Sequence, residues 1–228
     1  MLPFAALHDG KDYVVARHTL STLSSLNALR RLAPAGPREG SMVSFGWAGK
    51  GRRPLSFTGR EAEALGHTFE GAVVVQGAEA TRARFLKEAA GARLLHVATE
   101  ATFRPDAPLR TGLDLADGDL PLLEVLGLKL AHRPLVLLSA CETGVGVLAG
   151  ADGVVGLQQA FQAAGARQVV ATLWRISDLG SALLMKHLFR ELRAGQAPAA
   201  ALRRAQNRVR RRLAHPAFWS GFRLDGAP

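Results

Sequence analysis

The segment LVLLSACETG, residues 135–144, decides the fold. Its first four residues form a continuous apolar run of strand length, as expected for a strand buried on both faces of a sheet. A turn of small and polar residues follows and contains Cys141, the only cysteine of the chain. Open α/β sheets bind their ligands beyond the carboxyl ends of the strands. The sequence therefore places Cys141 at the binding edge of a sheet, although a lone cysteine is also typical of simple packing.

Strand-length apolar runs alternate with helix-length amphipathic segments along the chain. This alternation is typical of an α/β domain with a mostly parallel sheet flanked by helices on both faces. The expected strands are 42–45, 72–75, 94–98, 135–138, 168–173 and 222–224, and the expected helices are 60–68, 80–90, 153–164, 178–194 and 198–213. Asp178 is expected to be a helix N-cap, and Pro198 fits a first helical turn. Loops are expected at 34–40 and 48–54, where Gly and Pro gather.

The amino-acid composition limits the classes of protein to which this chain can belong. The 228 residues are 48% hydrophobic and 21% charged, which suits one folded domain and excludes a disordered chain. No stretch approaches the roughly 18 consecutive apolar residues of a membrane span, and the first residues lack the pattern of a signal peptide. The expected location is therefore the cytoplasm. The net charge of +10 would attract polyanions, but by itself it is weak evidence for a nucleic-acid partner.

Several motifs occur together and in the order of one known family. They are REA at 60–62, LHVAT at 95–99, SACETG at 139–144, GLQQAF at 156–161, VATLW at 170–174, AALR at 200–203 and HP at 215–216. In these motifs the chain resembles the CHAT domain, a caspase-like (clan CD) cysteine-peptidase fold that is often attached to tetratricopeptide repeats in bacteria. The resemblance implies a caspase/hemoglobinase-like sheet and a single domain over 1–228. The first residues resemble an internal stretch of that domain, so its first strand is expected to be missing.

The resemblance implies a Cys–His dyad, of which this chain retains one half. Cys141 occupies the nucleophile position. The family's base follows an Ala-Thr pair in a His-x-Ala-Thr-His-Gly pattern, but here Glu100 stands at the position of that histidine and Ala101 at the position of the oxyanion-hole glycine. A carboxylate near a thiol raises the thiol pKa by like-charge repulsion and supplies no imidazolium to stabilise the thiolate. The loss of a base costs on the order of a million-fold in turnover in a comparable nucleophile–base unit.

No other histidine is an obvious replacement for the missing base. His96 precedes Glu100 by four residues on the same expected strand, which places it roughly 13 Å away, so it is expected to be a core or strand-edge histidine. His132 precedes the Cys141 strand and lies at its opposite end. The remaining histidines lie on segments with no evident approach to Cys141.

Three functions remain open. The leading hypothesis is a CHAT-family module that keeps the peptidase fold, is weakly active or inactive, and acts by binding or regulation. The alternative is an active cysteine endopeptidase that uses Cys141 with Glu100 or another base. A nucleic-acid-binding domain rests only on charge and on the arginines at 203, 204, 208, 210, 211 and 212, which a solvated helix facing an acidic partner explains better.

The expected partners are a protein or peptide, including tetratricopeptide-repeat or other regulatory proteins; no membrane is expected, and nucleic acid is the disfavoured alternative. No cofactor and no metal site is expected, because the chain has neither paired Cys/His spacing nor a phosphate-binding loop.

Overall fold

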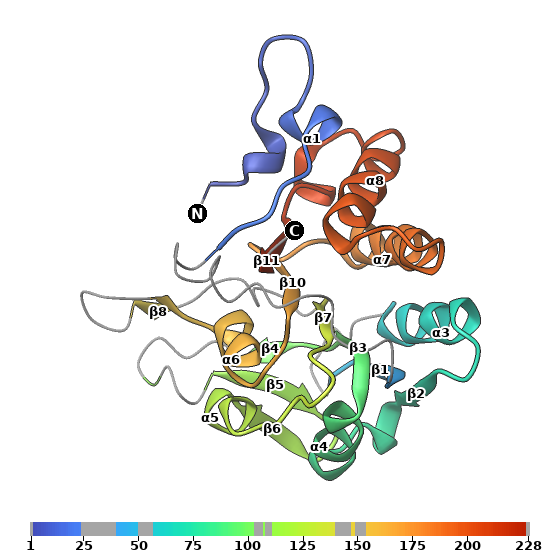
Figure 1. Cartoon of the computed structure of the whole chain (residues 1–228), viewed down its shortest axis with the longest axis vertical. Coiled ribbons are helices and arrows are strands. Elements are labelled where there is room, and N and C mark those ends of the chain that lie inside the picture. The colour runs from blue at the N-terminus through green and yellow to red at the C-terminus, as the bar shows by residue number, and fades with distance from the viewer. Residues whose placement is uncertain are drawn as a thin grey trace.

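A six-stranded sheet forms the centre of the molecule (Figure 1). The computed structural model describes residues 2–23, 40–49, 57–102, 107, 111–139, 147–148 and 154–226. The strand order is β11-β10-β7-β3-β1-β2, and every neighbouring pair is parallel except β10 with β11, which is antiparallel. These strands are β1 (Ser41–Gly46), β2 (Val73–Gln76), β3 (Ala92–Ala98), β7 (Leu135–Leu138), β10 (Gln168–Thr172) and β11 (Phe222–Gly226). The expected mostly parallel α/β sheet is confirmed, with all six expected strands in it.

Helices cover both faces of this sheet because its central strands are apolar on both sides. In β3, Leu94 packs into one buried cluster, whereas Leu95 and Val97 pack into the other. The first face carries α1 (Val14–Arg17), α3 (Thr58–Thr68), α7 (Asp178–Arg193) and α8 (Pro198–Arg210). The opposite face carries α4 (Arg82–Ala90), α5 (Leu122–Leu126) and α6 (Leu157–Ala163). Short 3-10 helices occur at Phe4–Ala6, Gly77–Glu79 and Pro216–Phe218.

Two local expectations were wrong. Asp178 does not cap α7: Ser177 is the N-cap, and its hydroxyl accepts a hydrogen bond from the Gly180 amide over 3.2 Å. The helix expected at 153–164 begins only at Leu157, because Val154–Val155 forms strand β9 with β8 (Val147–Leu148). In both cases a local hydrogen-bonding pattern, a side-chain cap for α7 and strand pairing before α6, determines the first helical residue more strongly than helix propensity does.

A small antiparallel sheet, absent from the expected elements, follows β3. It consists of β4 (Ala101–Thr102), β5 (Gly112–Leu115) and β6 (Gly118–Pro121). Gly118 has φ of 136°, a backbone conformation that glycine adopts without a side-chain clash, and it opens β6 after the turn. This sheet positions the residues immediately beyond β3. Most of the loops expected at 34–40 and 48–54 lies outside the described residues.

The N-terminal segment packs against α8. The Asp12 carboxylate pairs with the Arg210 guanidinium at 2.5 Å, and the Asn207 side-chain amide donates to the Val15 carbonyl at 2.9 Å. The Tyr13 ring meets the Trp219 ring edge to face at 5.0 Å. These contacts fix residues from the two ends of the chain side by side (Figure 1). Within the described part of the chain, no helix is both long enough and apolar enough to cross a membrane.

Candidate active site

The strands β3 and β7, which precede Glu100 and Cys141 in the sequence, are neighbours in the central sheet. The strands pair in parallel with Val97 opposite Leu138, and the Ser139 amide continues the ladder by donating to the Val97 carbonyl at 2.9 Å. Glu100 follows Val97 by three positions, just as Cys141 follows Leu138 by three. Cys141 itself lies outside the described residues. The strand register nevertheless supports the expectation that both sequence positions belong to this edge.

The backbone of Glu100 is held by the small antiparallel sheet. Its carbonyl accepts a hydrogen bond from the Asp114 amide at 2.9 Å, and the Thr99 hydroxyl donates to the Asp114 carbonyl. Ala101 is half-buried and pairs with Leu113. Position 101 is thus part of a strand in this protein, and its alanine packs against the adjoining core.

A second carboxylate lies beside Glu100. A Cβ atom added to Gly49 would lie 3.3 Å from Glu100 Oε2 and 3.5 Å from Asp114 Oδ2, so both side chains border the same glycine. Gly49 has φ of 79°, which disfavours any residue with a side chain there. A carboxylate beside a thiol disfavours formation of the thiolate by like-charge repulsion.

Sequence reasoning missed Asp114. The available signal was the alternation Leu113-Asp114-Leu115 followed by Asp117-Gly118, a pattern that predicts a hairpin. Recognition of this hairpin alone would not have paired Asp114 with Glu100, because the antiparallel register between β4 and β5 brings them together.

His96 lies in the core, as expected, and belongs to a buried polar network. Its Nδ1 lies 2.7 Å from the Ser44 hydroxyl, and its Nε2 lies 3.1 Å from Glu61 Oε1. Ser44 and His96 are 0% exposed and Glu61 is 4% exposed. The Phe189 ring from α7 packs edge to face on the imidazole at 5.2 Å. Both ring nitrogens of His96 therefore have partners inside the fold.

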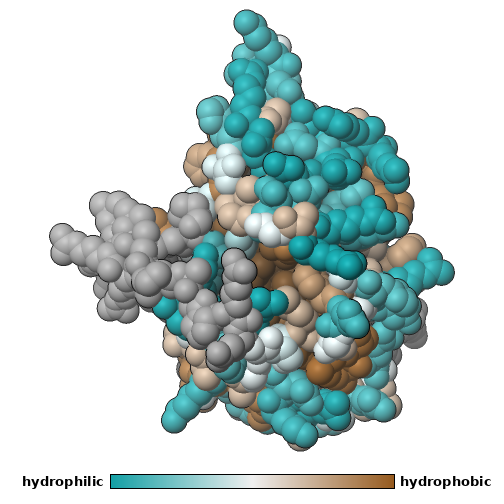
Figure 2. Space-filling model, turned by 45° about the vertical axis from the view of Figure 1, so that its right-hand side comes forward, coloured by the Kyte–Doolittle hydropathy of each residue, from teal (hydrophilic) through white to brown (hydrophobic). Residues whose placement is uncertain are grey.

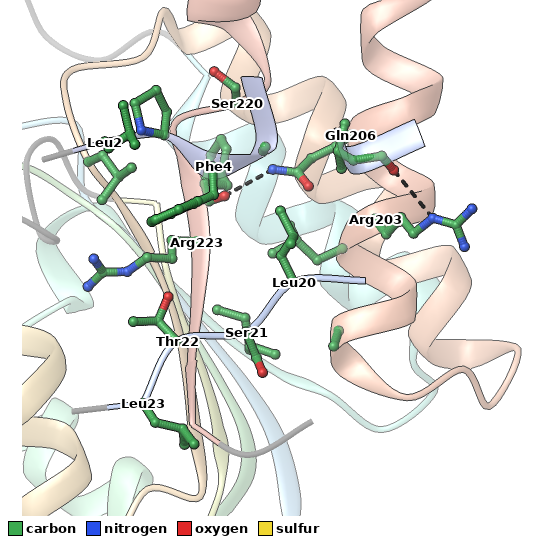
Figure 3. A pocket seen from close by; sticks show the side chains of 18 residues that line it. Leu2, Phe4, Leu20, Ser21, Thr22, Leu23, Arg203, Gln206, Ser220 and Arg223 are labelled. Carbon is green, nitrogen blue, oxygen red and sulfur yellow. Dashed lines mark hydrogen bonds between the residues drawn. The ribbon is translucent and has the colours of Figure 1, made fainter. Parts of the chain in front are cut away.

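A separate apolar cavity of about 360 Å³ lies between the N-terminal segment, α8 and β11 (Figure 3). Gln206 is a buried polar residue in its wall, and its amide donates to the Trp219 and Phe222 carbonyls at 3.0 and 2.9 Å. Arg203 on the same helix donates to the Val15 and Ala16 carbonyls. Since these polar groups already bond within the chain, the cavity offers an apolar surface rather than a reactive centre.

Metal ligation has no support in the described residues. Among them, no group of three or more His, Cys, Asp or Glu side chains is arranged to hold a metal ion.

Comparison with known proteins gives matches in both sequence and fold. The model of the CHAT domain family matches residues 1–227. Human tetratricopeptide repeat protein 28 is 36% identical over 110 residues, and the mouse protein is 34% identical over the same length. Each match covers 47% of this chain and only 4% of the relative, so the chain spans a small part of those proteins.

Solved structures extend the likeness to the whole fold. The Arg-specific cysteine proteinase gingipain R superimposes with a TM-score of 0.66 at 10% identity, over 88% of this chain and 51% of that chain. Separase in the Saccharomyces cerevisiae separase–securin complex gives a TM-score of 0.65 at 15% identity, over 92% of this chain and 14% of that chain. At these identities the likeness demonstrates a shared caspase-like fold.

Proposed function

The chain belongs to the CHAT domain family, and we propose that it is a weakly active or inactive peptidase homologue that acts as a protein-binding or regulatory module. In this proposal Cys141 keeps the nucleophile position, Glu100 occupies the position of the base, and Ala101 that of the oxyanion-hole glycine. Its partners are proteins or peptides. Two of its relatives are named as tetratricopeptide repeat proteins, and the separase structure contains securin, which supports a protein partner.

The observation that carries the proposal is the pair of carboxylates at the end of β3. Glu100 and Asp114 both approach Gly49, where a dyad would need a cationic imidazolium beside its thiolate. Negative charge there favours the neutral thiol, which is the unreactive form of cysteine. A carboxylic acid with an ordinary pKa near 4.3 is also a poor proton donor to a departing amine at pH 7.

An active endopeptidase is the second candidate, and one observation favours it. The nucleophile segment SACETG is intact although the position of the base has changed. A nucleic-acid-binding role has weaker support, because several arginines of α8 already bond within the chain: Arg210 pairs with Asp12, and Arg204 and Arg208 pair with Glu191.

The two candidates differ in the pKa of the Cys141 thiol. Since the chain has one cysteine, iodoacetamide consumption reports on Cys141 alone, and its rate against pH gives the thiol pKa. We expect a pKa at or above about 8.5 for the wild type, with alkylation at pH 6 no faster than for a free-cysteine peptide. We expect the Glu100→His variant to have a lower thiol pKa and faster alkylation at pH 6.

Asp114→Asn is the matched control, because it removes a neighbouring negative charge without supplying an imidazole. It should lower the thiol pKa less than Glu100→His does. A wild-type pKa well below 7 would overturn the proposal and assign an activated nucleophile. Peptide cleavage that the Glu100→His/Ala101→Gly variant gains would further support a cleft that is intact apart from its base.

A further inference from the structure

A groove of about 630 Å³ runs between α3 and α7 on the outer surface of their layer. Both helices begin near the carboxyl edge of the sheet, since each follows a parallel strand, β1 and β10 respectively. Figure 2 brings the side that bears α3 and α7 forward and shows a hollow of apolar surface bordered by hydrophilic side chains. Its lining comes from α3 with the preceding Phe57 and from α7.

Apolar side chains from both helices line one end of the groove. Leu179 is 46% exposed, and Leu183 follows it by one helical turn and is half-buried. Phe57 and Ala64 are half-buried on the α3 side. The exposed apolar surface of Leu179 is hydrated, so a partner that covers it is favoured by the hydrophobic effect.

Cations dominate the rims. Arg60, Lys186, Arg190 and Arg193 are all exposed, and in the described part of the chain none of them forms a salt bridge with a carboxylate. The Arg60 guanidinium lies over the Phe57 ring at 5.3 Å. Two carboxylates also line the groove. Glu61 is buried and forms a hydrogen bond with His96, and Glu63 is exposed.

The contrast with α8 shows that this charge is unusual even in a basic chain. Arg203 and Arg210 bond to the N-terminal segment, and Arg204 and Arg208 lie 3.6 and 3.3 Å from Glu191. The arginines of α8 thus serve the fold, whereas the groove presents four cations to whatever enters it. The complementary occupant carries carboxylates beside an apolar face.

The walls of the groove select a helix over an extended peptide. Both walls are α-helices whose backbone amides and carbonyls bond within the helix, so an extended peptide would find no strand edge to pair with. A helix satisfies its own backbone and contributes only side chains. At 1.5 Å per residue, α7 with its 16 residues is about 24 Å long, enough to support three to four turns of a third helix.

We propose that the α3/α7 groove is a docking site for an acidic amphipathic helix of a partner protein. The apolar face of that helix covers Leu179 and Leu183, and its carboxylates meet Lys186, Arg190 and Arg193. This inference goes beyond the proposed function, because it involves neither Cys141 nor Glu100. Its failure would leave the thiol chemistry of the sheet edge untouched, and the reverse also holds.

The experiment measures fluorescence anisotropy of a labelled 20-residue helical peptide with Leu at i, i+3, i+4 and i+7 and Glu on the flanking positions, titrated with the full chain. We expect saturable binding that weakens at least tenfold for Lys186→Glu/Arg190→Glu and several-fold for Leu179→Ser. The matched control, Arg211→Glu/Arg212→Glu, changes the net charge by the same amount on the exposed end of α8 and should alter binding no more than twofold. Unchanged melting temperatures verify folding, since all of these side chains are exposed.

Several results would overturn the inference. Equal loss in the groove variant and the α8 control would show that binding follows net charge alone. Equal binding of a peptide with two central prolines would exclude a helical occupant. Displacement by a single-stranded oligonucleotide at 0.2 M salt would assign the cations to nucleic acid. A wild-type dimer in sedimentation that Arg190→Glu disrupts would assign the groove to a second copy of this chain.

Discussion

The interior of β3 and its carboxyl end each carry an ionisable side chain, in opposite environments. His96 is fully buried between Ser44 and Glu61, and both of its ring nitrogens have partners. Glu100, four residues later, is half-buried, and only its backbone carbonyl accepts a hydrogen bond from a described residue. The difference teaches that neighbouring positions of one motif serve different purposes. The first builds the interface between the sheet and α3, and the second faces the site.

The largest effect is expected at His96. Replacement of His96 by Leu removes a partner of Glu61 and leaves a buried carboxyl group without its hydrogen bond, which costs about 3 kcal/mol. Urea unfolding of the wild type and the variant measures this loss in the free energy of unfolding. Glu61→Gln is the milder comparison, because the amide can still bond to the imidazole. A loss below about 1 kcal/mol for His96→Leu would contradict a structural role for the network.

His187 sharpens the comparison, because it is a buried histidine whose Nδ1 has no hydrogen-bond partner among the described residues. Burial lowers its pKa, and the positive charges of Arg208 and Arg190 lower it further. Below the unfolded pKa near 6.5, the unfolded chain therefore binds this proton more readily than the folded chain does. We expect the free energy of unfolding to fall as the pH decreases from 6.5 toward the lowered folded pKa, by at most about 1.4 kcal/mol per pH unit for one proton.

The matched variant for this prediction is His187→Gln, which keeps a polar side chain and removes the titration. Its unfolding free energy should depend less on pH between 6.5 and 5 than that of the wild type. If both chains show the same pH dependence, the loss arises from another group and His187 does not titrate as proposed.

The strands of the central sheet could be predicted from the sequence, but the side chains that meet beyond the carboxyl ends of those strands could not. The run 135–138 is apolar without interruption, and 94–98 is apolar apart from His96, as expected for strands buried on both faces, so the central strands were predictable. Asp114 was not, because its approach to Gly49 depends on the pairing of β5 with a two-residue strand, and strands this short have no periodicity. The α3/α7 groove was equally hidden, since Arg60 and Arg190 are distant in sequence and only helix packing brings them together.

The smallest change in the free energy of unfolding is expected at Glu100. This prediction tests the second of the two compared positions, the one beyond the carboxyl end of β3. Glu100→Gln keeps the shape of the side chain and removes its charge. Since the backbone pairing with Asp114 holds this residue in place, the free energy of unfolding should change by less than about 0.5 kcal/mol. Alkylation of Cys141 at neutral pH should nevertheless become faster, because one fewer carboxylate opposes the thiolate. A fold that weakens by more than about 1 kcal/mol with unchanged alkylation would make Glu100 a structural residue like His96, and the distinction between the two positions of the strand would disappear.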